Sequence, residues 1–167
     1  VVATPESFVA VSGHGLRATY GNHTILIGNR KRLKDSAIAV REIDATLQKL
    51  EQEGKTAVIV SIDNKLSGMI AMADTVKQGA RQVISTLGSM GAEVIMLTGD
   101  NERTARAIAS GLGIDQVIAQ VLPQEKEQMV AKLKGEGRVV AMVGDGINDA
   151  PALARADLGI AIGSGTD

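Results

Sequence analysis

The chain has 167 residues, of which 44% are hydrophobic, a net charge of -1 and no cysteine. It is long enough to bury a hydrophobic core, and its near-neutral charge gives no general affinity for nucleic acid or anionic membranes, so no nucleic-acid partner is expected. Disulfides and thiolate metal sites are excluded, and every apolar run is far shorter than the roughly 20 residues needed to cross a bilayer. We therefore expect a soluble globular polypeptide.

The first zone, residues 1–65, has the pattern of an antiparallel sheet with a helix. Gly21-Asn22 is typical of a tight hairpin turn, and apolar residues recur at helical spacing over 38–50 before Gly54, which marks the helix end. Four short segments are predicted as strands: 8–11, 18–20, 24–27 and 57–62.

From residue 66 to residue 167, predicted strands alternate with predicted helices. The strands are 69–72, 94–97, 117–119, 139–143 and 158–162. The helices lie around 76–87, 105–112 and 129–133, with a short one before the last strand. Such alternation predicts an α/β fold with a parallel, doubly wound sheet, joined here to part of a small antiparallel α+β domain.

Two predicted strands of this second zone end in polar residues. The strand at 139–143 runs into Gly144 and Asp145, with Asp149 four residues further on, and carboxylates beside glycine suit Mg²⁺ and phosphate. The alternative is an ordinary helix cap by Asp or Asn. The strand at 94–97 runs into Thr98-Gly99, which offers a hydroxyl and backbone N–H groups. In parallel sheets ligands bind where the strands end, so we expect Thr98 and Asp145 to share one edge.

Lys126 completes a set of groups suited to phosphoryl transfer. That reaction is catalysed mainly by positioning and by neutralising charge on the moving phosphoryl group. Lys126 follows Leu122-Pro123 at the start of a predicted helix, from which its ammonium could reach the same edge. The alternative is a solvated lysine on an exposed helix face, which is the commoner situation for a single lysine.

These segments resemble the cytoplasmic ATPase unit of P-type heavy-metal-transporting ATPases, and copper-transporting ones most closely. The resemblance rests on Met-Leu-Thr-Gly-Asp-Asn at 96–101, on Leu-Pro at 122–123 with Lys126, and on Val-Gly-Asp-Gly-Ile-Asn-Asp-Ala-Pro-Ala-Leu at 143–153. Gly-His-Gly-Leu at 13–16 and Ile-Gly-Asn at 27–29 extend it over nearly the whole chain. It implies a haloacid-dehalogenase-like sheet, with ATP and Mg²⁺ as cofactors.

The resemblance also implies roles by position. Asp145 resembles the Mg²⁺ ligand. Five residues resemble those that act at the phosphoryl group: Thr98, Gly99, Lys126, Asn148 and Asp149. Six resemble residues that lie against the nucleotide: Gly13, Gly15, Leu16, Gly28, Asn29 and Asp100. Asp74 matches an acid near the domain junction, but it is also a common helix-cap residue, and each glycine also suits an ordinary tight turn.

The sequence departs from this family in two motifs. It contains neither the Asp-Lys-Thr-Gly-Thr motif that carries the nucleophilic aspartate nor the Ser-Glu-His-Pro adenine motif; His14 and His23 are interpreted as turn residues. We interpret the chain as an excised piece: residues 1–65 as the C-terminal part of the nucleotide domain, and 66–167 as the phosphorylation domain without its nucleophile strand. By itself it is expected to form no aspartyl phosphate.

The partners implied are the missing Asp-Lys-Thr-Gly-Thr segment, the membrane domain and the actuator domain of a pump, with this unit at the cytoplasmic face of the membrane. Gly-Ile-Ala-Ile-Gly-Ser-Gly-Thr-Asp at 159–167 and Ala-Asp-Thr-Val-Lys at 73–77 look more like copper-exporting than zinc or cadmium pumps. Three alternatives stay open: a zinc or cadmium pump, a nucleotide-binding fragment without catalysis, and a haloacid-dehalogenase-type phosphatase.

Overall fold

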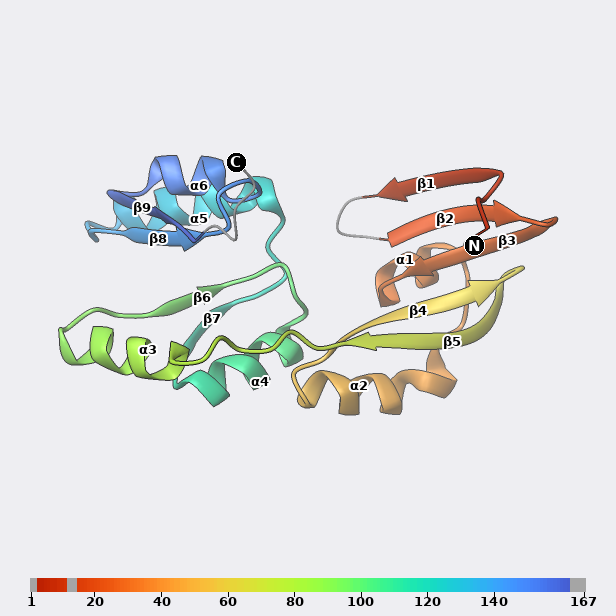
Figure 1. The fold of residues 1–167 in the computed structure, drawn as a ribbon, viewed down its shortest axis with the longest axis horizontal. Helices are drawn as coiled ribbons and strands as arrows, with labels where there is room; N and C mark the ends of the chain where they lie inside the picture. The colour runs from red at the N-terminus through yellow and green to blue at the C-terminus, as the bar shows by residue number, and fades with distance from the viewer. Residues whose placement is uncertain (1–2, 12–14, 163–167) are drawn as a thin grey trace. The chain divides into compact units, whose positions relative to one another are not determined.

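The computed structural model describes residues 3–11 and 15–162 (Figure 1). Their strands form three sheets: one of five strands and two of two strands. The chain divides into two compact units. One unit takes in the residues up to Met96 together with Asp100–Val117, and the other takes in Leu97–Gly99 together with the residues from Ile118 onward.

The five-stranded sheet is antiparallel throughout, in the order β1-β2-β3-β4-β5. Its strands are β1 (Ser7–Val11), β2 (Gly15–Tyr20), β3 (His23–Gly28), β4 (Thr56–Ile62) and β5 (Lys65–Met72). The predicted hairpin turn is confirmed, since Gly21 and Asn22 have φ of 56° and 67°. Positive φ at both central residues gives the turn whose twist matches that of the flanking strands.

Helices cover one face of this sheet. They are α1 (Arg30–Asp35), the 3-10 turn η1 (Arg41–Ile43) and α2 (Asp44–Gln52). Leu33 and Leu47 from the helices pack with Leu26 and Ile59 from the strands, and Leu33 and Ile59 are fully buried. The predicted stop of α2 is also confirmed: Gly54 has φ of 74°, and the next amide, Lys55 N–H, bonds back to Leu50 C=O at 3.0 Å.

The strand expected to open the parallel zone belongs instead to the antiparallel sheet. β5 runs from Lys65 and pairs with β4 over its whole length, from Ile62↔Lys65 to Thr56↔Met72. The prediction of a parallel strand at 69–72 is therefore wrong. The turn at Asp63-Asn64, with φ of 50° and 61°, folds β5 straight back onto β4, as a two-residue hairpin does.

After β5 the chain alternates between helices and strands, as predicted. The elements are α3 (Ala80–Ser89), β6 (Ile95–Leu97), α4 (Glu102–Leu112), β7 (Gln116–Ile118), α5 (Pro123–Gly135), β8 (Ala141–Gly144), α6 (Ala150–Arg155) and β9 (Leu158–Ala161). α3 begins four residues later than the pattern at Val76 predicts, because Gly79 before it takes φ of 86°.

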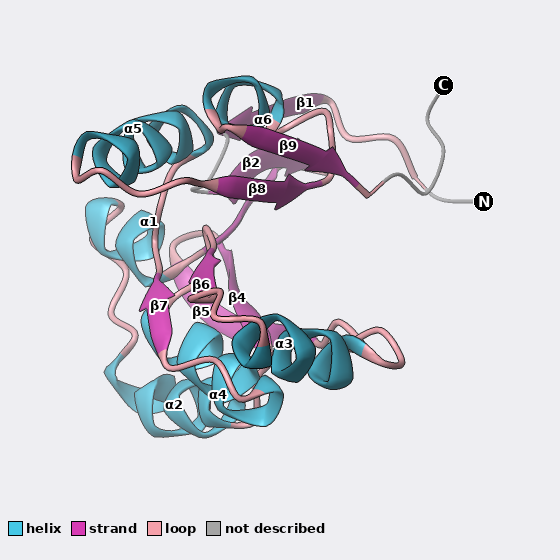
Figure 2. Cartoon of the chain, turned by 90° about the vertical axis from the view of Figure 1, so that its left-hand side faces the viewer, coloured by secondary structure: helices cyan, strands magenta, loops and turns pink. Residues whose placement is uncertain are grey.

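The last two strands pair in parallel, with Ala141 opposite Leu158. α6 lies against this pair and α5 packs on α6 (Figure 2). Val130, Met142 and Ala152 form the core of this second unit. Within the described part of the chain β6–β7 and β8–β9 are separate two-stranded sheets, so the four strands do not form the single sheet that was expected. Of the residues described, none lies in a helix long and apolar enough to cross a membrane.

Candidate functional site

The loop that follows β8 is organised by two side chains. Asp145 accepts a hydrogen bond at Oδ1 from Asn148 N–H (3.0 Å) and another at Oδ2 from Asn148 Nδ2 (2.8 Å). These bonds hold an exposed carboxylate directly after the strand. The pKa of the Asp145 carboxyl lies below its ordinary value, mainly because the Asn148 side-chain amide donates to it; partial desolvation opposes this, and backbone N–H groups add to the lowering.

Lys126 and Asp149 form an ion pair next to this loop. Lys126 Nζ lies 2.7 Å from Asp149 Oδ1, and the two side chains are only 17% and 10% exposed. The second oxygen of Asp149 accepts a 3.3 Å bond from Asp145 N–H. Removing two charges from water costs nearly as much as their attraction returns, so such a pair adds little net stability. What it provides is an ammonium held beside the end of β8.

Local sequence places Lys126 in the first turn of α5. Pro123 opens the helix, where its missing N–H leaves no bond unmade, and Glu125 Oε2 accepts from Leu122 N–H at 2.8 Å. The lysine is therefore not the freely solvated side chain of the alternative interpretation. It contacts Asp149, which is 23 positions away in the sequence.

Gly144 has a role that differs from the one expected for it. Glycine beside the carboxylates was expected to suit Mg²⁺ and phosphate, but a Cβ at Gly144 would lie 2.5 Å from Asp149 Oδ2. The space is filled by the carboxylate of the protein itself. Any larger residue would push Asp149 away from the strand end and so disturb its bond to Lys126.

Thr98 and Gly99 directly follow β6. Thr98 N–H donates to Ile118 C=O at 3.0 Å, and Val121 N–H donates to Thr98 C=O at 3.1 Å, so the loop is tied to the chain after β7. A Cβ at Gly99 would lie 3.3 Å from Val121 C=O, which leaves little room for a side chain. Thr98 and Asp145 both lie at strand ends, as predicted. That they share one edge stays a prediction, since β6 and β8 belong to different sheets.

The residues present fit a Mg²⁺ site of the type that binds the ion together with phosphate. Within residues 3–11 and 15–162, no group of three or more His, Cys, Asp or Glu side chains could hold a metal alone. Mg²⁺ is typically held by one or two carboxylates, with water and phosphate oxygens completing its shell. Asp145 offers such a carboxylate, exposed and held in place by Asn148.

Four of the residues predicted to lie against a nucleotide meet at one end of the hairpin β2–β3. Gly15 pairs with Gly28 and Leu16 with Ile27, and Asn29 follows directly. Gly15 has φ of 132°, and a Cβ there would lie 2.1 Å from Ile27 C=O. Asn29 caps α1, its side chain accepting from Arg32 N–H at 2.9 Å. Gly13 lies outside the described residues.

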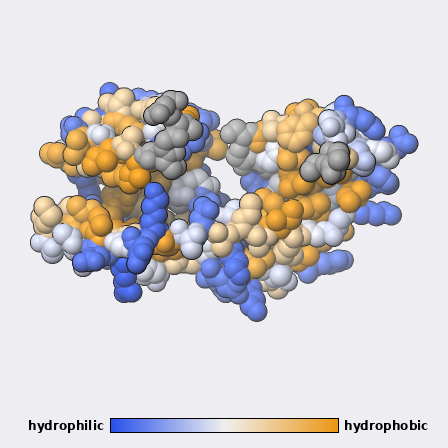
Figure 3. All heavy atoms as spheres, viewed as in Figure 1, coloured by the Kyte–Doolittle hydropathy of each residue, from blue (hydrophilic) through white to orange (hydrophobic). Residues whose placement is uncertain are grey.

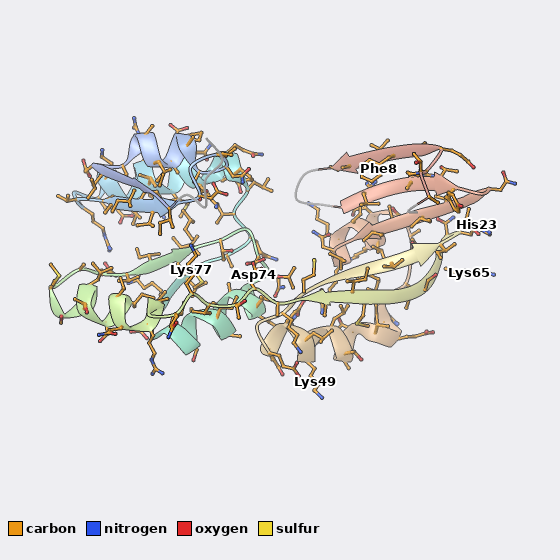
Figure 4. All side chains as sticks on the ribbon, in the orientation of Figure 1. Phe8, His23, Lys49, Lys65, Asp74 and Lys77 are labelled. Carbon is orange, nitrogen blue, oxygen red and sulfur yellow. The ribbon has the colours of Figure 1, made fainter. Side chains whose placement is uncertain are left out.

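Three other predicted residues lie apart from that hairpin end. Asp100 accepts from Thr56 Oγ1 at 3.2 Å. Asp74 lies exposed between β5 and α3, close in sequence to Lys77 (Figure 4). It precedes the α3 cap, Gly79, by five residues, so the helix-cap alternative is wrong for it. His23, interpreted as a turn residue, is instead the first residue of β3, directly after the Gly21-Asn22 turn, and bonds to Asp63 at 2.7 Å.

Two residues of this region were missed in the sequence. Thr56 bonds to Asp100, and Thr104 is 1% exposed in the first turn of α4, where its hydroxyl bonds to Lys55 C=O at 3.0 Å. No motif marks either threonine. Each pairing spans more than 40 positions, which a pattern of local spacing does not reveal.

A family comparison identifies the architecture. Residues 3–157 match the model of the haloacid dehalogenase-like hydrolases. The chain belongs to the haloacid dehalogenase-like hydrolase family. This confirms the fold class predicted from the alternating elements. In this haloacid dehalogenase-like chain Thr98 and Asp145 directly follow the carboxyl ends of β6 and β8.

Individual relatives are similar over the whole chain. A copper-exporting P-type ATPase of Staphylococcus aureus (strain Newman) is 52% identical over 168 aligned residues, covering 100% of this chain and 21% of its own length. One from strain JH9 is 54% identical over 162 residues, covering 96% and 20%. This haloacid dehalogenase-like chain thus spans about a fifth of the length of the curated relatives it matches.

Solved structures give the same result. A zinc-transporting PIB-type ATPase in the E2.Pi state is 39% identical with a TM-score of 0.59, covering 100% of this chain and 26% of that one. The catalytic CPx-ATPase domain CopB-B is 25% identical with a TM-score of 0.66, covering 100% and 57%. The resemblance to P-type metal-transporting ATPases noted in the sequence is therefore confirmed for this haloacid dehalogenase-like chain.

Proposed function

We propose that this chain is the part of a P-type ATPase that binds ATP and supplies most of the groups for phosphoryl transfer, and that the pump exports copper. The observation that carries the proposal is the Lys126–Asp149 pair beside Asp145, at the end of β8, in a haloacid dehalogenase-like chain.

Each group has a distinct task in this proposal. Lys126 neutralises negative charge on the transferred phosphoryl group, held ready by Asp149. Thr98 offers its hydroxyl, and Gly99 its backbone N–H, to phosphoryl oxygens. Such preorganised donors act where charge develops and cost no reorganisation during the reaction. Asp145 would hold Mg²⁺, which would supply positive charge to neutralise the phosphate oxygens.

The nucleotide itself is proposed to lie against Gly15, Leu16, Gly28 and Asn29. Support comes from the register of β2 and β3, which places the two glycines opposite each other. Gly15 itself is required by the close approach of β3, because a Cβ there would lie 2.1 Å from Ile27 C=O. Gly13 is proposed to contribute to the same nucleotide site, and Asp100, next to Gly99, to contribute at the phosphate end of the nucleotide.

The phosphate acceptor is proposed to be an aspartate of another part of the longer protein. No Asp-Lys-Thr-Gly-Thr motif occurs in this sequence. Support comes from β6–β7 and β8–β9, which are separate two-stranded sheets within the described residues although the alternation of strands and helices predicts one parallel sheet. The membrane and actuator domains are likewise proposed as its partners, with this unit at the cytoplasmic face.

Copper is favoured by the 52% and 54% identical relatives, which are described as copper-exporting. The 39% identical zinc-transporting structure keeps zinc as the second candidate. The test is ATP hydrolysis by the full-length protein in membranes with Cu⁺, Zn²⁺ or Cd²⁺ added singly. We expect stimulation by Cu⁺ alone; stimulation by Zn²⁺ without Cu⁺ would establish the second candidate.

Magnesium use has its own test. Asp145→Asn removes the charge that Mg²⁺ needs while keeping nearly the same shape, so phosphorylation should require far more Mg²⁺ while the fold survives. Asp115→Asn, an exposed position after α4, serves as the control. An unchanged Mg²⁺ dependence in Asp145→Asn would put the metal elsewhere.

A further inference from the structure

The loop between β6 and α4, residues 98–101, is held by hydrogen bonds at its C-terminal end. Its last residues, Asp100 and Asn101, lead directly into α4. Asn101 caps that helix, its Oδ1 accepting from Thr104 N–H at 3.1 Å. The cap also works in reverse, because Asn101 Nδ2 donates to Thr104 Oγ1 at 2.8 Å. The end of the loop and the first helical turn are thus locked together by two bonds.

Thr104 also connects this helical turn to the residue before β4 of the antiparallel sheet. Its hydroxyl, buried with the residue at 1% exposure, donates its single proton to Lys55 C=O at 3.0 Å. Lys55 stands immediately before β4. The hydroxyl is therefore used fully, as acceptor from Asn101 and as donor to Lys55, which a methyl group of the same shape would not reproduce.

The next residue along the chain makes a second attachment. Thr56, the first residue of β4, donates from Oγ1 to Asp100 Oδ1 at 3.2 Å. Two successive residues, Lys55 and Thr56, thus bond to Thr104 in the first turn of α4 and to Asp100 in the loop before it. The strand that follows Thr56 is anchored in the core, since Ile59 and Ser61 are 0% and 1% exposed.

A third connection joins the first turn of α4 to α2. Arg103, in the first turn of α4, reaches Glu51 of α2 at 3.2 Å, and the Glu51 side chain is 4% exposed. Arg30 at the start of α1 bonds to the same carboxylate. α4 is therefore held by α2 as well as by β4, and its N-terminus has little freedom to shift.

We propose that Thr104 and Thr56 are positioning residues that hold Asp100 and Asn101, and through the peptide bond to Gly99 the phosphate-binding loop, in the geometry that phosphoryl transfer requires. This inference rests on the proposed function of Thr98 and Gly99. Displacing a reacting group by about 1 Å can cost on the order of a hundredfold in rate, so a loop of this kind needs a fixed support.

The test compares Thr104→Val with Thr104→Ser in the full-length protein. Valine keeps the shape and loses both hydroxyl bonds, whereas serine keeps the hydroxyl. We expect Thr104→Val to slow phosphoenzyme formation from ATP about tenfold with the nucleotide Kd within about twofold of wild type, as for loss of a buried hydrogen bond. Thr104→Ser should restore most of the rate. Ala109→Gly, equally buried on α4 but away from the loop, is the control for lost stability and should keep the wild-type rate.

Two results would overturn the inference. One is a wild-type rate in Thr104→Val. The other is a rate in Thr104→Val that is no lower than in Ala109→Gly, with the same loss of nucleotide affinity in both variants. Thr56→Val removes the second attachment and keeps the test decisive if Thr104→Val does not fold: we expect a smaller loss in the same direction, and no loss would contradict the proposal.

A separate measurement distinguishes this inference from the proposed function. Wild-type phosphorylation in Lys126→Ala would reject the proposed function. The support of the loop is measured independently by NMR on the 167-residue chain. The order parameters of the Gly99 and Asp100 amides should fall in Thr104→Val toward values below about 0.6, typical of flexible backbone, and remain unchanged in Ala109→Gly. Unchanged order parameters in Thr104→Val would overturn the positioning role.

Discussion

The two units differ in how their strands are paired and covered. In the antiparallel sheet all five strands pair with strands of the same unit, and helices bury one face over Leu26 and Ile59. In the pair β8–β9 every residue of β9 is exposed, with Leu158 at 56% and Ile160 at 42%. Strands of parallel sheets are normally buried on both faces, so these strands lack the cover they usually have.

The difference follows from how the two kinds of sheet are connected. Antiparallel strands are joined by turns of two residues, so neighbours in the sequence are neighbours in the sheet. Parallel strands depend on long crossovers and on strands far away in the sequence. The antiparallel sheet is nevertheless open on its second face, where Phe8, Ile62 and Ile70 are exposed on the strands. Figure 3 shows hydrophobic residues at the surface of this part of the chain. Each unit thus folds around one covered face.

The largest expected effect is a loss of stability in one unit and not in the other. Leu33→Ala removes a fully buried side chain from the antiparallel core, so it should lower the free energy of unfolding of that unit by about 3 kcal/mol. Urea titration followed by residue-resolved NMR checks this. Signals from α5 and β8 should keep the wild-type midpoint. If both units lost stability together, the division into two would be contradicted.

A smaller effect is expected inside the antiparallel sheet. Gly15→Ala forces a Cβ to within 2.1 Å of Ile27 C=O at φ of 132°, and we expect a loss of about 2 kcal/mol of stability. Gly68→Ala is the matched control, because a Cβ there meets no atom within 4 Å. Denaturation of both variants is the measurement. If Gly15→Ala is destabilised through strain, it loses more stability than Gly68→Ala. Equal losses would show only a general cost of replacing a strand glycine.

The smallest effect concerns pH and the second unit. Asp157 accepts from Val140 N–H at 2.9 Å and lies 2.9 Å from Lys134 Nζ, and the backbone bond from Val140, followed by the lysine, lowers the pKa of its carboxyl. A carboxyl with a lowered pKa stabilises the fold fully above its unfolded pKa of about 3.9, and this contribution is lost as pH falls through the folded value. Asp157→Asn should therefore differ most from wild type in Tm near neutral pH, and the difference should shrink as the pH falls below the unfolded pKa of about 3.9. A constant difference would contradict this.

The sequence predicted best what is determined locally. Gly21-Asn22 requires positive φ at two successive residues and Gly54 ends a helix, and both signals are complete within a few positions. The partner of 69–72 was predicted wrongly because a short apolar strand looks the same whether its neighbour is parallel or antiparallel.

In the site, the motifs indicated which residues matter but not which of them touch. Lys126 bonds to Asp149 from a different helix, and Thr104 bonds to Lys55 across 49 positions. Such contacts depend on how elements pack, which no spacing rule contains. Gly144 shows the same limit, since its need for glycine comes from the Asp149 carboxylate lying against it.

The most direct measurement is phosphoenzyme formation from radiolabelled ATP in the full-length protein, trapped as an acid-stable, hydroxylamine-labile adduct. Lys126→Ala and Lys134→Ala each remove one ion pair from α5, and only the first lies beside Asp145. We expect Lys126→Ala to slow the reaction about a hundredfold, as for loss of one charge-stabilising donor, and Lys134→Ala to keep the wild-type rate. Equal rates in the two variants would contradict a phosphoryl-transfer site at the end of β8.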